Sequence, residues 1–207
     1  PRNVFNKMNI KKPTILGLTG SIGMGKTTTA KMFSDRGVPV WDADETVHRL
    51  YKTDKKTIGV FQRKIPQVVF NNQVSRDALK KFLTENDENL KKVEKIIHPI
   101  VAKDREMFLS NAKEKKVPLV VLDIPLLFET GNDKIVDFVA VVTVDAITQR
   151  TRVLNRNTMS EEMFSNILSK QLPNKYKIDR ADFVIFTKSM AIAQDQVDEI
   201  ISNFVGP

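Results

Sequence analysis

The stretch Ile15-Leu-Gly-Leu-Thr-Gly20-Ser-Ile-Gly-Met-Gly25-Lys26-Thr27 decides the fold of this chain. It begins as an apolar run with β-strand character and ends in the pattern Gly-x-x-x-x-Gly-Lys-Thr over residues 20–27. A helix-forming segment follows at once. Strand, glycine loop and helix in this order are the context that a phosphate-binding loop requires, so the stretch predicts nucleotide binding. The alternative, a glycine-rich turn with a solvated lysine, does not account for this context.

Each part of this phosphate loop has a physical reason. Its glycines let the backbone adopt positive φ and approach an anion, while amide N–H groups and the positive end of the next helix face the phosphates. Lys26 is placed to reach the β- and γ-phosphates, and the Thr27 hydroxyl to coordinate Mg²⁺. The predicted nucleotide-binding residues of the loop are Gly20, Ser21, Ile22, Gly23, Met24, Gly25, Lys26, Thr27 and Thr28.

The composition is that of an ordinary globular domain. A chain of 207 residues can bury a sizeable core, and 41% hydrophobic and 28% charged residues are usual values. The lack of cysteine excludes a disulfide framework and a cysteine metal site. No apolar run approaches the ~20 residues of a membrane span, and residues 1–13 are basic, unpatterned and unlike a signal peptide. We expect a cytoplasmic protein without a membrane partner, and we assign the tail no role.

The formal net charge of +8 leaves three kinds of partner open: nucleic acid, an anionic surface or a polyanionic small molecule. With two Tyr and one Trp, the chain offers a poor stacking platform for single-stranded nucleic acid. A lysine-rich solvated surface explains most of the excess charge, and a phosphate-rich ligand explains the rest. We therefore expect no nucleic-acid partner, and a monomer or weak homo-oligomer.

Apolar runs that alternate with helical segments predict a parallel α/β sandwich. Residues 45–112 have helical periodicity without a strand signal, which predicts an all-helical insertion, and Pro99 should kink it or start a fresh helix. Asp44 is the expected N-cap where the second strand meets this insertion. The five expected strands are residues 14–19, 38–42, 117–123, 137–144 and 182–186.

Carboxylates follow two of these strands. In open α/β folds ligands bind at the carboxyl ends of the strands, so both positions fall on the same rim as the phosphate loop. Asp123 is a candidate for holding Mg²⁺ or water, or else a plain strand-end residue. Asp42 and Asp44 are candidates for the general base or a metal contact, and because close carboxylates titrate together, the sequence does not decide between them.

Basic side chains provide the remaining candidates. Arg152 and Arg156 lie one helical turn apart, so on one helix they share a face and could clamp phosphates. The alternative is a solvated helix face, which we favour for Arg150. His98, which precedes a proline, is either a structural residue or a ligand contact.

Several of these motifs together resemble dephospho-coenzyme A kinases. The resemblance rests on the loop at Gly17–Thr27, Val40-Trp-Asp-Ala-Asp44-x-x-x-His48, His98-Pro99 and Asp123-Ile-Pro-Leu-Leu-Phe-Glu129. It continues in order through Gln149-x-x-Arg152-x-x-x-Arg156 and Ala181-Asp-Phe-Val-Ile185, and it covers residues 14–205. The phosphate loop alone fits many families, whereas the two aspartate motifs with this spacing are far more specific.

The resemblance implies a P-loop kinase fold like that of nucleoside-monophosphate kinases, with a five-stranded parallel sheet sandwiched by helices. It also implies a division of the chain into a core, a helical coenzyme-binding insertion and a mobile lid whose closure excludes water. The core would comprise residues 14–57, 114–149 and 166–207. The insertion would be residues 58–113 and the lid residues 150–165.

The implied reaction moves the γ-phosphate of ATP to the ribose 3′-hydroxyl of dephospho-coenzyme A, with Mg²⁺ as cofactor. By the resemblance, Asp44 accepts or orients the hydroxyl proton, Lys26 and Arg152 act on the transferring phosphate, and Arg156 binds the nucleotide. Thr27 and Asp123 are the implied metal ligands. The implied acceptor-binding residues are Asp44, His48, His98, Asp123 and Leu126.

Two departures from the family pattern concern the nucleotide side. Phe186 stands where similar proteins often carry Asp, and Lys170 precedes Gln171 where Arg is common. Two alternatives stay open. One is a kinase of another small hydroxyl acceptor, and the other is a nucleoside-triphosphate-dependent switch or nucleic-acid binder. The stretch Asn174-Lys175-Tyr176-Lys177 begins like a guanine-recognition motif but lacks its final Asp.

Overall fold

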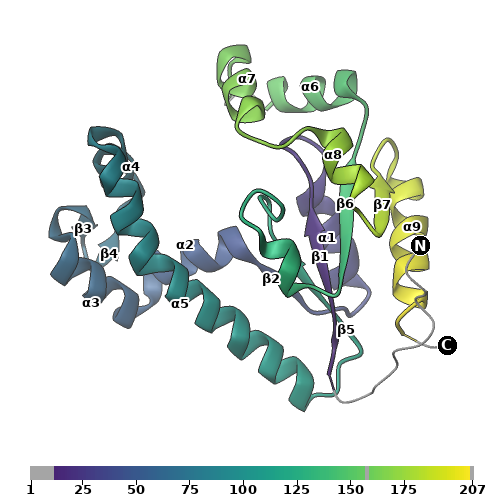
Figure 1. Cartoon of the computed structure of the whole chain (residues 1–207), viewed down its shortest axis with the longest axis horizontal. Coiled ribbons are helices and arrows are strands. Elements are labelled where there is room, and N and C mark those ends of the chain that lie inside the picture. Colours follow the sequence, from purple (N-terminus) through teal and green to yellow (C-terminus); the bar gives the residue numbers. More distant parts are fainter. Residues whose placement is uncertain (1–11, 157–158, 206–207) are drawn as a thin grey trace. The chain divides into compact units, whose positions relative to one another are not determined.

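A five-stranded sheet forms the centre of the larger of two compact units, in a computed structural model that describes residues 12–156 and 159–205 (Figure 1). The strand order is β2-β5-β1-β6-β7, and β1 pairs in parallel with both β5 and β6. The expected parallel sheet is confirmed. The strands are β1 (Thr14–Thr19), β2 (Val40–Asp42), β5 (Leu119–Asp123), β6 (Phe138–Thr143) and β7 (Phe183–Phe186).

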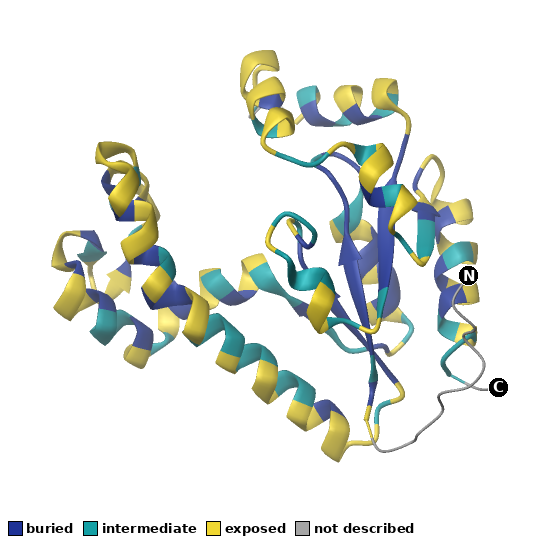
Figure 2. Ribbon diagram, viewed as in Figure 1, coloured by how far each residue is buried: buried dark blue, intermediate teal, exposed yellow. Residues whose placement is uncertain are grey.

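Helices cover both faces of this sheet. On one face, α1 (Lys26–Asp35) and α9 (Met190–Ser202) pack against the alternate residues of β1, β5 and β6, and Phe33 and Val197 are fully buried there. On the other face, α8 (Asn174–Asp179) contacts β6, and Leu127 packs against β1. Figure 2 shows the central strands as buried almost throughout, which explains why they read as continuous apolar runs.

Two further helices follow β6 along the chain. These are α6 (Ala146–Leu154) and α7 (Glu161–Ser169), which contact each other. Ser160 is the N-cap of α7, and its hydroxyl accepts a hydrogen bond from the Met163 amide. The expected lid of residues 150–165 includes residues 157–158, which lie outside the described residues. The same holds for the first eleven residues of the basic tail.

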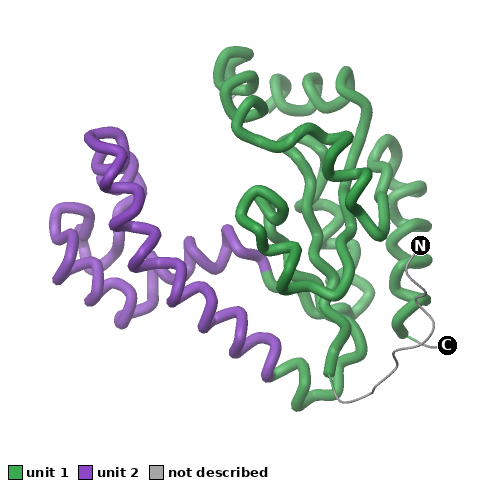
Figure 3. Tube along the Cα trace, viewed as in Figure 1, with its two compact units in different colours: residues 1–41, 111–207 green, residues 42–110 purple. Residues whose placement is uncertain are grey.

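The second compact unit comprises residues 42–110 and has a hydrophobic core of its own (Figure 3). Phe61 and Val68 are fully buried in that core, and Tyr51 packs edge-on against Phe61. The unit begins at Asp42, not at residue 58 as expected from the resemblance. Its elements are α2 (Ala43–Thr53), α3 (Lys55–Lys64), the 3₁₀ turn η2 (Pro66–Val68), β3 (Val69–Phe70), β4 (Gln73–Val74), α4 (Arg76–Glu85) and α5 (Asp87–Glu114), whose last residues belong to the first unit.

Two local expectations for this unit, the all-helical insertion and the Asp44 N-cap, are wrong, and one of the two alternatives for Pro99 is excluded. The insertion is not all-helical, because β3 and β4 form a short antiparallel hairpin whose turn residues Asn71 and Asn72 have positive φ. No fresh helix starts at Pro99, since α5 runs through it as one helix of 28 residues. The N-cap of α2 is Asp42, whose carboxylate accepts a hydrogen bond from the Glu45 amide, so Asp44 lies in the first turn.

Candidate functional site

The phosphate loop joins β1 to α1 with the backbone geometry that anion binding requires. Gly23 and Gly25 have φ of +79° and +96°, a region that disfavours residues with a Cβ. Gly25 is the N-cap of α1 and has no side chain to bond the first-turn amides. These amides and the positive end of the helix are therefore left to an external anion.

Gly20 serves a different purpose from the one expected of it, because φ at this residue is not positive. A Cβ at Gly20 would lie 2.7 Å from the Val142 carbonyl oxygen, so the residue permits close packing of the loop on β6. Gly23 is required for two reasons. Its φ is positive, and a Cβ at this position would lie 2.5 Å from the Val153 side chain of α6. The loop is thus fixed against two neighbouring elements at positions where only glycine fits.

Lys26 and Asp123 form an ion pair at the end of this loop. The Lys26 Nζ lies 2.6 Å from the Asp123 Oδ1, and β1 and β5 run in register up to Leu18 and Asp123. The Asp123 side chain is fully buried, whereas 15% of the Lys26 side chain is exposed. Thr27, in the next position, is exposed. The structure therefore brings together three of the residues that the sequence singled out for phosphate and metal chemistry.

A second lysine–carboxylate pair lies beside the start of the loop. The Lys177 Nζ, on α8, lies 2.8 Å from the Glu129 Oε1 and donates a hydrogen bond to the Ser21 hydroxyl at 3.3 Å. Glu129 also accepts from the Leu172 amide at 3.0 Å. Burial raises the pKa of the Glu129 carboxyl, but the hydrogen bonds from Lys177 and Leu172 outweigh burial and hold that pKa below its ordinary value. Sequence reasoning missed this pair.

Two glutamines hold the backbone of Ile22, the residue between Ser21 and Gly23. The Ile22 amide donates to the Gln171 Oε1 at 3.1 Å, and the Ile22 carbonyl accepts from the Gln149 Nε2 at 2.7 Å. Gln149 is a buried residue of α6, and Gln171 follows the end of α7. In the sequence analysis both glutamines were named only within family-like stretches, and neither was assigned a role.

A cavity of about 330 Å³ lies beside the phosphate loop in the first unit. Arg152 borders this cavity and donates two hydrogen bonds to Thr187, one to the hydroxyl at 3.0 Å and one to the carbonyl at 2.6 Å. The Thr187 hydroxyl in turn donates to the Met24 carbonyl. The lining includes Gly23, Gly25, Thr28, Thr29, Met32, Arg152, Arg156, Thr187, Ser189, Met190 and Ala193.

Arg152 and Arg156 both line this cavity, but they do not lie on one helix face as expected. Arg156 lies beyond Leu154, the last residue of α6, so it does not share a helix face with Arg152, although both line the cavity. Arg150 points elsewhere and pairs with Glu161 on an exposed surface, in keeping with its interpretation as a solvated residue. Phe186 is half exposed, and its amide donates to the Gln196 side chain.

The candidate residues on the helices of the second unit, Asp44, His48 and His98, are exposed, and Asp42 is partly exposed. Asp44 and His48 lie one turn apart on α2, and His98 lies on α5. Spacing of four residues places Asp44 and His48 on one face of their helix. The Asp42 carboxylate caps α2 by accepting a hydrogen bond from the Glu45 amide. The Asp44 carboxylate, two residues later, is not the cap of this helix.

Within the described ranges, no group of three or more His, Cys, Asp or Glu side chains is arranged to hold a metal ion. In the same ranges, no helix is long and apolar enough to cross a membrane.

Comparison with known proteins gives a consistent result. Residues 14–192 match the family model described as dephospho-CoA kinase. The dephospho-CoA kinase of Ruegeria pomeroyi is 46% identical over 90% of this chain and 93% of its own length. That of Agrobacterium fabrum is 45% identical over 90% and 96%.

Solved structures agree with the sequence comparison. A crystal structure from Thermus thermophilus superposes with a TM-score of 0.79 at 29% identity, over 92% of this chain and 97% of that one. Dephospho-CoA kinase from Campylobacter jejuni superposes with a TM-score of 0.66 at 25% identity, over 91% and 95%.

Proposed function

This chain belongs to the dephospho-CoA kinase family, and from this premise we propose how its own residues carry out the reaction. The reaction is the ATP-dependent phosphorylation of dephospho-CoA, in which the γ-phosphate moves to the ribose 3′-hydroxyl and yields coenzyme A and ADP. It needs a phosphate cradle, cations for the migrating charge and a group that accepts the hydroxyl proton.

The nucleotide binds along the phosphate loop and in the cavity beside it. The observation that carries this assignment is the cavity itself, which borders Gly23, Gly25 and Arg152 and so adjoins the anion-binding end of α1. Backbone amides from Gly25 to Thr27 hold the phosphates, whereas the Met24 amide donates to the Ser21 carbonyl within the loop. The volume of about 330 Å³ lies in the range of small-molecule sites and suits the nucleoside part.

Lys26 and Arg152 stabilise the negative charge that spreads over the transferring phosphoryl group. Lys26 is partly exposed at the end of the loop, and Arg152 lines the cavity. Oxygen ligands suit Mg²⁺, which usually keeps several waters and phosphate oxygens, so the Thr27 hydroxyl and the Asp123 carboxylate fit such an ion. When bound, Mg²⁺ would neutralise charge on the β- and γ-phosphates.

Asp44 accepts the proton of the acceptor hydroxyl as that hydroxyl attacks the γ-phosphorus. The exposure of Asp44 on α2 and the use of Asp42 as a cap favour Asp44 over Asp42 for this role. His48, on the same helix face, together with His98 and Leu126, binds the acceptor. The helical insertion is the coenzyme-binding part, and residues 150–165 form the lid.

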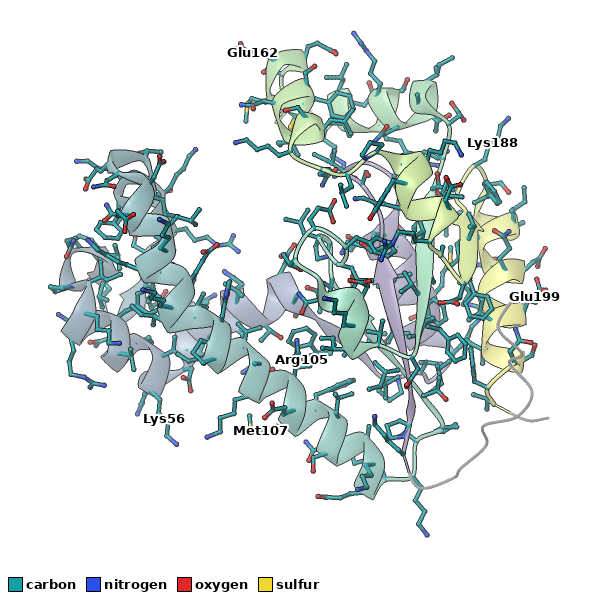
Figure 4. The ribbon with its side chains drawn as sticks, viewed as in Figure 1. Lys56, Arg105, Met107, Glu162, Lys188 and Glu199 are labelled. Atoms are coloured by element: carbon teal, nitrogen blue, oxygen red, sulfur yellow. The ribbon has the colours of Figure 1, made fainter. Side chains whose placement is uncertain are left out.

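The acceptor is a small molecule and not a nucleic acid. Several exposed lysines are paired with carboxylates, as in Lys31–Asp35, Lys91–Glu88 and Lys175–Asp179, which reduces the field available to a polyanion. Exposed charged side chains such as Lys56 on α3, Lys188 in the loop before α9 and Glu199 on α9 project from different parts of the chain (Figure 4). The enzyme works as a monomer or weak homo-oligomer. Nucleic-acid binding that falls steeply with salt would contradict this assignment.

The test is ADP release from ATP·Mg²⁺ with and without dephospho-CoA, with the product checked by mass for one added phosphate. We expect strong stimulation by dephospho-CoA, which Asp44→Asn removes while ATP binding persists. Asp42→Asn is the matched control, because asparagine still caps α2 and the same charge is lost. Loss of turnover in Asp42→Asn with activity retained in Asp44→Asn would reverse the assignment of the base.

A further inference from the structure

Two glutamine side chains from other parts of the chain hold the phosphate loop at Ile22. Both backbone polar groups of Ile22 are engaged: its amide donates to Gln171, and its carbonyl accepts from Gln149. Gln171 must present its side-chain oxygen to the Ile22 amide, and Gln149 its side-chain nitrogen to the Ile22 carbonyl. The Ile22 backbone therefore fixes the orientation of both glutamine side-chain amides.

The two glutamines lie at opposite ends of the segment that carries α6 and α7. Gln149 is in α6, before residue 150, and Gln171 follows α7 after Lys170, its C-cap. The contact between α6 and the loop is also tight next to Ile22, because a Cβ on Gly23 would lie 3.1 Å from the Gln149 carbonyl oxygen. Both ends of this segment therefore attach to a single residue of the phosphate loop.

We propose that Gln149 and Gln171 are positioning residues that fix the Ile22 backbone, and through it the phosphate loop, to both ends of the α6–α7 segment. Their effect is on the binding of ATP phosphates, because a loop held in its binding geometry loses less entropy when the anion arrives. This inference rests on the proposed nucleotide site. The geometry attaches the glutamines to the loop, and neither belongs to the residues proposed to bind the acceptor.

A matched pair of substitutions separates the hydrogen bonds from charge. Gln149→Glu replaces the amide that donates to the Ile22 carbonyl by a carboxylate that cannot donate. Gln171→Glu preserves an oxygen that accepts from the Ile22 amide. Both variants add the same charge beside the same residue, at nearly unchanged shape. We expect Gln149→Glu to weaken ATP binding by about tenfold or more and Gln171→Glu by less than about threefold.

Neutral variants complete the test. Gln149→Met and Gln171→Met each remove one hydrogen bond without adding charge, and each should raise KM for ATP by about fivefold to tenfold. The KM for dephospho-CoA should stay within about twofold of wild type. ATP binding is measured by calorimetry without acceptor, and thermal unfolding reports on the fold.

The possible results separate the inference from the proposed function. Equal weakening of ATP binding by the two Glu variants would overturn the inference, because charge alone would then explain both. The inference would also be overturned if the Met variants lost thermal stability and their KM values for ATP and for dephospho-CoA rose equally. Wild-type protein that binds no ATP would overturn the proposed nucleotide site and the inference together. Wild-type binding with unchanged Met variants would overturn the inference alone.

Discussion

Two lysine–carboxylate pairs flank the phosphate loop, and their exposure is reversed. In the Lys26–Asp123 pair the lysine is 15% exposed and the carboxylate fully buried. In the Lys177–Glu129 pair the lysine is fully buried and the carboxylate is 13% exposed. The N–O distances, 2.6 and 2.8 Å, are similar. The two pairs differ in which charged group is partly exposed: the lysine in the first pair and the carboxylate in the second.

The difference shows how one kind of interaction supports two tasks. Lys26 ends the loop and can meet a phosphate while Asp123 remains beside it, so its charge is available to substrate. Lys177 is fully buried, and its ammonium group bonds the Glu129 carboxylate and the hydroxyl of Ser21 at the start of the loop. A buried lysine of this kind contributes order at the loop and no charge to the reaction. The following predictions test that contrast.

The largest effect should come from removing charge at the ligand-facing pair. The double variant Lys26→Met/Asp123→Asn leaves no unpaired buried charge, so it should fold. Its turnover should nevertheless fall by at least about 10²–10³-fold, because the cation at the transferring phosphate and the proposed Mg²⁺ ligand are both lost. Steady-state ADP release and thermal unfolding together measure this. A double variant that keeps more than a tenth of wild-type turnover would show that Lys26 is not catalytic.

At the enclosed pair, the effect should be on stability. Lys177→Met leaves the buried Glu129 carboxylate unpaired and should lower the free energy of unfolding by about 3–5 kcal/mol. Adding Glu129→Gln should recover most of this loss, because glutamine is neutral and still accepts from the Leu172 amide. Urea unfolding of the wild type and both variants gives the values. If Lys177→Met unfolds like the wild type, the pair does not stabilise the fold.

The pH dependence of stability should reveal the same pair. The pKa of Glu129 in the folded protein lies below its ordinary value of 4.5, because the bonds from Lys177 and Leu172 outweigh burial. A carboxyl with a depressed folded pKa stabilises the protein above its unfolded pKa, and this contribution is lost as pH falls through the folded value. Below about pH 4.5 the wild type should therefore lose stability faster than Lys177→Met/Glu129→Gln. Parallel profiles for the two proteins would contradict this cause.

The fold was largely predictable from the sequence for a definite physical reason. The central strands are buried on both faces, so they read as apolar runs, and the glycine loop fixes where the first strand ends. The β3–β4 hairpin was missed because two-residue strands carry no periodicity, although Asn71-Asn72 is a turn signal that could have indicated it.

The site was predictable where residues have intrinsic chemistry. The structure brings Lys26 next to Asp123 and places Arg152 at the cavity, and the roles expected of these residues stay predictions. Lys177 was missed because a lysine in a polar six-residue helix reads as exposed, and its partners are distant in sequence. The use of Gln149 by the loop depends on tertiary packing, which no local pattern encodes.

The smallest effect should come from a lysine two residues from Lys177. Lys175 lies on the same helix α8 and also pairs with a carboxylate, Asp179, but the two side chains are 85% and 56% exposed. Water and salt screen such a pair, so Lys175→Met should change the free energy of unfolding by about 0.5 kcal/mol or less. Urea unfolding of Lys175→Met and of Lys177→Met compares the stability loss from the same substitution at an exposed and at a buried position of α8. A Lys175→Met loss as large as that of Lys177→Met would mean that α8 itself, and not burial of the Lys177–Glu129 pair, controls stability there.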